Sequence, residues 1–213
     1  MDLTSIQLMQ GASGASGETT YVDDVFSTYL YKGNDSTITV NNGIDLSTEG
    51  GLVWTKTRNT SYNHFLFDTA RGTQTALSTS LNNANFNETK GVTSFNTNGF
   101  TIGGSGGDGG FNASGTNYNS WTFRKAPGFF DVVTWTGNSD TNQTISHSLK
   151  SRPGMIIAKR TDSSTTGDWV VYHRDHAGYL KLNSTNAAVS DSGAWTPVTS
   201  TSFKAYDLSL IHI

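Results

Sequence analysis

The chain has 213 residues, of which 34% are hydrophobic and only 15% are charged, and its formal net charge is −3. This length suits one large β domain or two domains of about 100 residues each, and the lack of basic runs argues against nucleic-acid binding. The absence of cysteine excludes disulfides and thiolate zinc sites, and no stretch approaches the roughly 20 apolar residues of a membrane span.

The composition favours strands and turns. The chain contains 23 glycines and 11% aromatic residues, and Gly, Ser, Thr and Asn favour turns over helix interiors. Aromatic residues at this level are atypical of disordered chains and, together with Val and Thr, are frequent in strands. We therefore expect an all-β protein.

Residues 1–20 are expected to form a flexible N-terminal linker. The sequence of residues 11–17 is GASGASG, a composition typical of flexible segments. The N-terminus lacks the basic and apolar regions of a signal peptide. We expect the folded part to begin near Tyr21.

From there the sequence predicts short strands separated by turns. In residues 64–69, HFLFDT, Phe65 and Phe67 share one face, which we expect to be buried. Residues 93–102 indicate a hairpin around the turn at residues 96–99. The other predicted strands are residues 25–32, 51–57, 76–80 and 118–124, a Gly-rich loop covers residues 103–115, and residues 129–136, FFDVVTWT, begin a second series.

The second series repeats the first at an offset near 103–105 residues. Residues 29–34, 51–56, 64–68 and 77–79 align with residues 133–138, 154–159, 169–173 and 182–184. A constant offset indicates an internal duplication and predicts two tandem β-sandwich domains, residues 21–126 and 127–207. The second is expected to be truncated, because nothing after Phe203 matches residues 100–102 or 118–124.

The last six residues, 208–213, read LSLIHI. This hexapeptide is what the adapter of transposase-based sequencing libraries encodes in one frame (CTG TCT CTT ATA CAC ATC). We interpret it as adapter read-through at the end of a truncated fragment; a native apolar tail is the alternative. On the first interpretation, His212 belongs to no site.

Several motifs resemble a signature of large structural proteins of marine bacteriophages and cyanophages. The likeness covers roughly residues 11–205 and lies in residues 21–31, 50–54, 66–72, 93–96, 121–133, 153–160 and 168–174. Similar proteins are labelled virion structural, tail or fibre proteins with a domain of unknown function. The resemblance implies concanavalin- or laminin-G-like jelly rolls, a place in the virion, and other virion proteins or further copies of the chain as partners. It implies no catalytic motif, so no functional residue is carried over.

The sequence shows no catalytic constellation. Glycoside hydrolysis needs two carboxylates about 5–10 Å apart, but Glu occurs only at positions 18, 49 and 88. Asp131, the best carboxylate within a predicted strand, has no visible partner. The nucleophile motif G-x-S-x-G is absent. We expect no enzymatic activity.

Two motifs for cofactors or metals have simpler interpretations. Residues 104–109 fit G-x-G-x-x-G, which binds dinucleotides between a strand and a helix; here more Gly, Asn and Ser precede a strand, so we interpret it as a surface loop. His173 and His176 flank Asp175, but no third ligand follows at a defined spacing. We therefore expect no cofactor and no metal.

Charged candidates for ligand binding lie at the ends of equivalent strands. Binding loops occur at such positions, although solubility also places charge there. These candidates are Asp68 and Arg71 in the first unit and His173 and Arg174 in the second.

The tryptophans supply one more candidate, because exposed aromatic rings can bind sugars by stacking and apolar contact. Trp54, Trp121 and Trp135 lie inside predicted strands and are expected in the core. Trp195 lies in a loop rich in Ser, Gly and Pro and is expected to be exposed.

The function expected first is that of a phage virion structural protein, in the tail, the fibre or the capsid decoration, that acts through protein–protein assembly. The alternative is a lectin-like carbohydrate-binding module that recognises host-surface polysaccharide, since jelly rolls serve both purposes. A polysaccharide-degrading enzyme is disfavoured, because no acid/base pair is visible.

Overall fold

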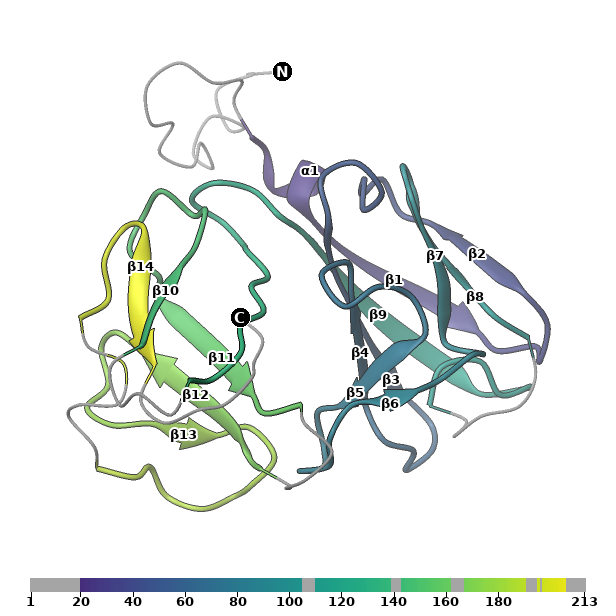
Figure 1. Ribbon diagram of the computed structural model, residues 1–213. Coiled ribbons are helices and arrows are strands. Elements are labelled where there is room, and N and C mark those ends of the chain that lie inside the picture. The colour runs from purple at the N-terminus through teal and green to yellow at the C-terminus, as the bar shows by residue number, and fades with distance from the viewer. Residues whose placement is uncertain are drawn as a thin grey trace, which may run out of the picture.

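A computed structural model of the chain describes residues 20–104, 110–138, 143–161, 167–190, 195 and 197–205. Within them it confirms the all-β prediction: one short helix accompanies fourteen strands in antiparallel sheets (Figure 1). The predicted linker, apart from residue 20, most of the G-x-G-x-x-G motif and the hexapeptide 208–213 lie outside the described residues.

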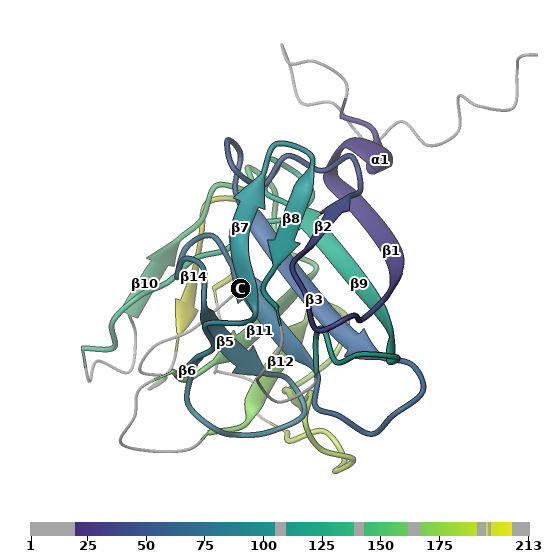
Figure 2. The ribbon, with the colours of Figure 1, turned by 90° about the vertical axis from the view of Figure 1, so that its right-hand side faces the viewer.

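The first lobe, residues 20–124, contains two sheets that face each other (Figure 2). The larger has the order β1-β9-β3-β4-β5-β6 and the smaller the order β2-β8-β7. The elements are α1 (Val22–Val25), β1 (Phe26–Lys32), β2 (Ile38–Asn41), β3 (Gly51–Thr57), β4 (Phe65–Asp68), β5 (Thr75–Ser78), β6 (Phe86–Asn87), β7 (Val92–Asn96), β8 (Gly99–Ile102) and β9 (Asn117–Arg124).

The core of this lobe lies between its two sheets. As predicted, Phe65 and Phe67 are buried there, packed edge-on against Phe111. Leu66 lies between them in the sequence and on the opposite face of the strand, yet it is also buried. A strand with a single core on one side would leave that face exposed. The strand is covered on both faces, because the second lobe packs against the outer face of the large sheet.

The second lobe, residues 130–205, has a three-stranded and a two-stranded sheet. The strands are β10 (Gln143–Ser146), β11 (Met155–Lys159), β12 (Trp169–His173), β13 (Leu180–Lys181) and β14 (Ser202–Ala205). The three-stranded sheet has the order β11-β12-β13, and β10 pairs with β14. Between the sheets, Trp135 packs edge-on against Phe203, and Ile156 and Tyr172 complete the core.

A third apolar layer joins the two lobes. Leu52, Leu66 and Leu77 of the large sheet contact Val132 and Trp169 of the second lobe. The Trp169 indole N–H donates to the carbonyl oxygen of Ser78 at 2.9 Å. The molecule is therefore a stack of four sheets with three apolar layers, and the two lobes lie side by side (Figure 1).

The strand pairing of the second lobe resembles that of the first. Strand β10 pairs antiparallel with β14 as β2 does with β8, and the order β11-β12-β13 matches β3-β4-β5. In these pairs Phe203 lies opposite Ile145 as Phe100 lies opposite Val40. Strand β14 thus has the position in the second lobe that β8 has in the first.

The prediction of a strand at residues 129–136 is wrong. The segment is irregular, apart from a single bridge between Ala126 and Phe130. Its counterpart β1 is a strand because it pairs with β9 along seven residues, and the described part of the second lobe has no strand equivalent to β9. The apolar side chains of Val132 and Trp135 are buried nonetheless, in two different cores.

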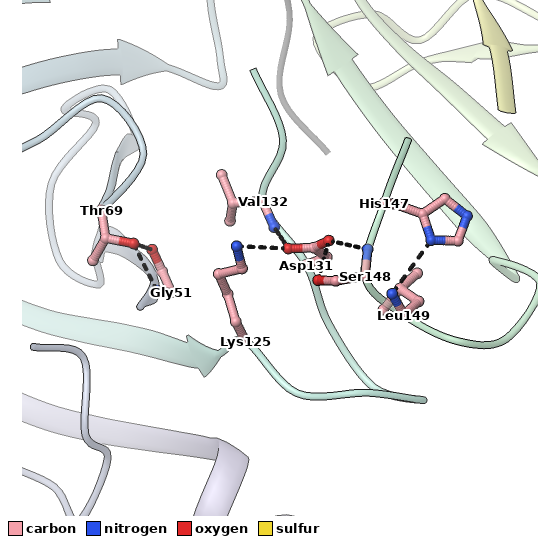
Figure 3. A network of polar contacts seen from close by, with 8 residues as sticks. All are labelled: Gly51, Thr69, Lys125, Asp131, Val132, His147, Ser148 and Leu149. Carbon is pink, nitrogen blue, oxygen red and sulfur yellow. Dashed lines mark hydrogen bonds and ion pairs between the residues drawn. The ribbon is translucent and has the colours of Figure 1, made fainter. Parts of the chain in front are cut away.

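A polar cluster fixes the junction between the lobes (Figure 3). Asp131 is buried and accepts hydrogen bonds from the backbone N–H groups of Val132 and Ser148 and from the Ser148 hydroxyl. Lys125, at the end of the first lobe, lies 2.9 Å from the same carboxylate. The cluster ties the connecting segment to the loop after β10.

Candidate functional site

An aromatic groove lies where the outer face of the large sheet meets the segment that follows β13. Its volume is about 910 Å³. Strands β3 and β9 contribute Trp54, Trp121 and Phe123, the ends of β4 and β5 contribute His64, Thr79 and Ser80, and the second lobe contributes Leu182, Asn183, Ser184 and Thr185. Both lobes therefore form the groove.

The strand register explains why these residues meet. Trp121, Trp54 and Leu66 are consecutive cross-strand partners on β9, β3 and β4. Side chains two residues apart share a face, so the next row on the same face is Asn119, Lys56 and His64. An apolar row thus lies beside a polar row on the outer face, opposite to the face that buries Phe65 and Phe67.

The two tryptophans form a fixed platform. Their ring centroids are 5.8 Å apart and their planes are inclined by 58°. The Trp54 indole N–H donates to Thr79 Oγ1 at 3.0 Å, which fixes the orientation of that ring. Both side chains are half-buried, so part of each remains open to the groove. An amphipathic ring held in this way can contact the apolar face of a sugar.

The wall from the second lobe is polar and held in place by hydrogen bonds. Asn183 accepts from the backbone N–H of Trp169 and donates to Asp168, both at 2.9 Å. Asp168 in turn pairs with Lys181 at 2.6 Å. Ser184 Oγ likewise accepts from the backbone N–H of Asn186 at 3.1 Å. The hydroxyl protons of Ser184 and Thr185 can still be donated to a ligand.

His64 is a neutral polar group at ordinary pH. Partial burial lowers its pKa, and the nearby positive charge of Lys56 lowers it further. A neutral imidazole can both donate and accept a hydrogen bond. None of the described residues that line the groove is an Asp or a Glu.

Trp195, the expected exposed platform, is only 2% exposed. Its ring packs against Tyr172 and Phe203 in the core of the second lobe. The expectation of an exposed Trp195 is wrong, because in a lobe with two short sheets the indole fills the core from a loop. It therefore provides no surface for a sugar.

Asp68 and Arg71 form an ion pair within the chain. Asp68 is fully buried, and its carboxylate accepts from the backbone N–H of Arg71 at 2.9 Å and from its Nε at 2.7 Å. Burial lowers the pKa of Arg71, and the charge of Asp68 opposes that effect. The pair closes the turn after β4, where it stabilises the fold.

His173 and Arg174 are exposed at the end of β12. The Arg174 guanidinium lies 3.7 Å from Asp175, whose backbone N–H donates to His173 Nδ1 at 3.3 Å. Within the described residues, no three His, Asp or Glu side chains gather where a metal ion could bind. The charged candidates therefore do not extend the aromatic groove, which they do not line.

The sequence analysis missed the groove because it assigned Trp54 and Trp121 to the core. The available signal was alternation: the strands that bury Phe65 and Val53 on one face place Trp54 and Lys56 on the other. Recognising the groove also requires the pairing of β3 with β9, which are far apart in the sequence.

Comparison with known proteins gives one result. A family described as a domain of unknown function, DUF7483, matches residues 22–210. The chain belongs to the DUF7483 family. The match includes both lobes, so the groove between them lies within one DUF7483 domain. No curated protein and no solved structure matches the chain. In the described part of this DUF7483 chain, no helix has the length and apolar character needed to cross a membrane.

Proposed function

We propose that this DUF7483 chain is a non-enzymatic carbohydrate-binding module whose binding site is the aromatic groove. The observation that carries the proposal is the Trp54–Trp121 pair on the groove floor, faced by hydroxyl and amide groups of the second lobe. Sugars offer apolar C–H faces for aromatic rings and hydroxyl groups for polar walls. A groove between lobes suits a linear polysaccharide better than a buried pocket does.

A tryptophan substitution tests this function. Trp121→Ala removes half of the platform, and we expect binding to any glycan found on an array to weaken by at least about tenfold, which corresponds to ~1.4 kcal/mol. Isothermal titration with the best array ligand gives the affinity. Tyr21→Ala is the matched control, because Tyr21 is an aromatic residue that is 54% exposed and lies outside the groove. Equal binding by both variants would contradict the proposal, as would an array without any bound glycan.

The absence of catalysis is part of the same proposal. Polysaccharides that bind should be recovered at their original chain length after long incubation, with no new reducing ends. Release of reducing ends that is lost in Trp121→Ala would instead indicate a hydrolase.

We propose the virion as the place where the module acts, in contact with other virion proteins or with copies of itself. The resemblance to marine phage structural proteins supports this place. The edge strand β1 offers a second reason, because Leu30 is 59% exposed on it and its outer backbone edge has no paired strand in the described structure. Exposed strand edges are templates for pairing with another chain.

The genomic neighbourhood tests this second proposal. We expect the source DNA to carry portal, capsid or tail genes beside this reading frame. Neighbours devoted to sugar degradation would refute the virion assignment and leave the groove proposal standing.

We also infer that the lobes descend from one duplicated jelly-roll-like unit. The shared pairing of β2–β8 with β10–β14 and of β3-β4-β5 with β11-β12-β13 supports this origin. A solved structure of a longer relative would test it, because a complete second unit should contain a strand paired as β9 is.

A further inference from the structure

The polar row beside the groove carries one positive charge, that of Lys56. Lys56 on β3 lies opposite Asn119 on β9 and, by continuation of the register, opposite His64. The charge of Lys56 is close enough to His64 to lower the pKa of that imidazole. Lys56 does not itself line the groove, but it neighbours His64, which does. We call Lys56 and His64 the basic corner at the edge of the groove.

Nothing in the described structure neutralises this corner. Among the described residues, Lys56 forms no ion pair, and the carboxylates of Asp68 and Asp168 are paired with other side chains. Asp68, also on the outer face, is buried against Arg71, and Asp168 behind the groove wall is paired with Lys181. The described residues of the groove lining include no carboxylate. The local field therefore favours an anion, although the whole chain is formally negative.

The charge of Lys56 lies beside the row of Trp54 and Trp121, where a polymer bound on the two rings would present its acid groups. Lys56 and Trp54 are two residues apart on one strand, which sets their Cα atoms ~7 Å apart on the same face. A pyranose ring spans a similar length, so a sugar stacked on the tryptophans brings its own or its neighbour's substituents to the corner.

We propose that the groove selects acidic polysaccharides, with a carboxylate or sulfate group bound at Lys56 while sugar rings contact Trp54 and Trp121. This inference rests on the carbohydrate-binding function proposed above and adds the class of ligand. Uronates and sulfated sugars share the recognised chemistry, an anionic oxygen group on a polysaccharide.

Matched pairs of polymers test the selection. Polygalacturonate is compared with its methyl ester, and dextran sulfate with dextran, by affinity electrophoresis and titration of the full chain. We expect each acidic polymer to bind more tightly than its neutral counterpart, and that preference to shrink as salt rises, because added ions screen exposed charge pairs. Which acidic polymer binds more tightly distinguishes the carboxylate from the sulfate.

The Lys56→Gln variant removes the charge and keeps a shorter, polar side chain. Its affinity for the acidic polymer should fall about three- to fivefold, the range of one exposed ion pair, with no change for the neutral polymer. Lys204→Gln on β14 removes the same charge outside the groove and should leave both affinities unchanged. Equal losses in the two variants would overturn the inference, because they would reflect net charge alone.

The tryptophan variant separates this inference from the function on which it rests. If Trp121→Ala loses both polymers and Lys56→Gln loses neither, the groove binds carbohydrate without charge selection, and the acidic ligand class is wrong. If Trp121→Ala loses neither, the groove is not the binding site and both proposals fail.

Discussion

His64 and Lys56 face each other across two strands, and this arrangement sets the charge of the groove. Burial disfavours the charged imidazole, and the ammonium group of Lys56 adds repulsion. At neutral pH the histidine is therefore uncharged, and Lys56 alone supplies the positive charge of the basic corner.

A titration of His64 tests this account. In Lys56→Gln the repulsion disappears, so the pKa of His64 should rise toward its ordinary value, while burial still holds it below. The measurement is an NMR titration of the imidazole resonances. The Lys204→Gln protein should titrate like the unmodified chain. A pKa that stays unchanged or falls in Lys56→Gln would mean that the lysine charge does not reach His64.

Sequence patterns predicted individual residues well where one neighbouring layer decides their burial. Phe65 and Phe67 alternate with a strand period and are buried as expected. The burial of Trp195 was not predicted, because a loop residue belongs to no periodic pattern. Its burial depends on how the two sheets of the second lobe pack, and local sequence does not show that packing. Trp54 was assigned to the core, but the second lobe covers only part of the outer face of the large sheet. Alternation shows on which face a side chain lies and not how far another layer covers that face.

Among the elements, the segment between the lobes depends on Asp131. Burial raises the pKa of this carboxyl, but hydrogen bonds from Ser148 and the contact with Lys125 outweigh that effect, so the pKa lies below its ordinary value. A lowered pKa in the folded state means that the group stabilises the fold above the unfolded-state pKa of about 3.9. That contribution is lost as the pH falls through the folded-state value.

Asp131→Asn should therefore destabilise the chain by about 2 to 3 kcal/mol at pH 7, because a buried charged acceptor is replaced and Lys125 loses its partner. Urea unfolding at pH 7 and pH 3 measures the effect, and the difference between variant and parent should shrink at pH 3. Asp175→Asn serves as control, since the Arg174–Asp175 contact is exposed. A pH-independent cost would argue that the loss is steric.

Elements with strong local signals were predicted close to their true bounds, and weak ones were missed. Strand β3 matches the predicted residues 51–57, and the hairpin of β7 and β8 follows from its turn. Strands β2 and β10 have four residues each and lack aromatic side chains, so nothing local marks them. The predicted strand at 129–136 has the right composition, but no described strand pairs with it.

At the scale of the whole molecule, the layer between the lobes makes them one folding unit. Trp169 is 1% exposed, packs with Leu52, Leu66 and Leu77, and donates to Ser78. Further bonds cross the same contact, where Gly167 N–H and the buried Lys159 ammonium donate to the carbonyl oxygen of Asn82. The outer face of the large sheet would expose its leucines without this cover.

Trp169→Ala should cost about 3 to 5 kcal/mol and destabilise both lobes together. Hydrogen exchange is the measurement, and we expect faster exchange in β3 and β4 as well as in β11 and β12. Val189→Ala, at a 38% exposed site, should have little effect. Faster exchange confined to the second lobe would show that the lobes unfold independently.

The groove has one wall from each lobe, and this division has a consequence for any ligand that fills it. A polymer that touches β3 and β9 on one side and residues 182–185 on the other stabilises the docked arrangement of the lobes. The apparent affinity for such a ligand scales with the fraction of molecules whose lobes are docked, so a change that undocks the lobes in most molecules weakens binding. The contact that holds the fold together thereby also sets how tightly the groove can hold its ligand.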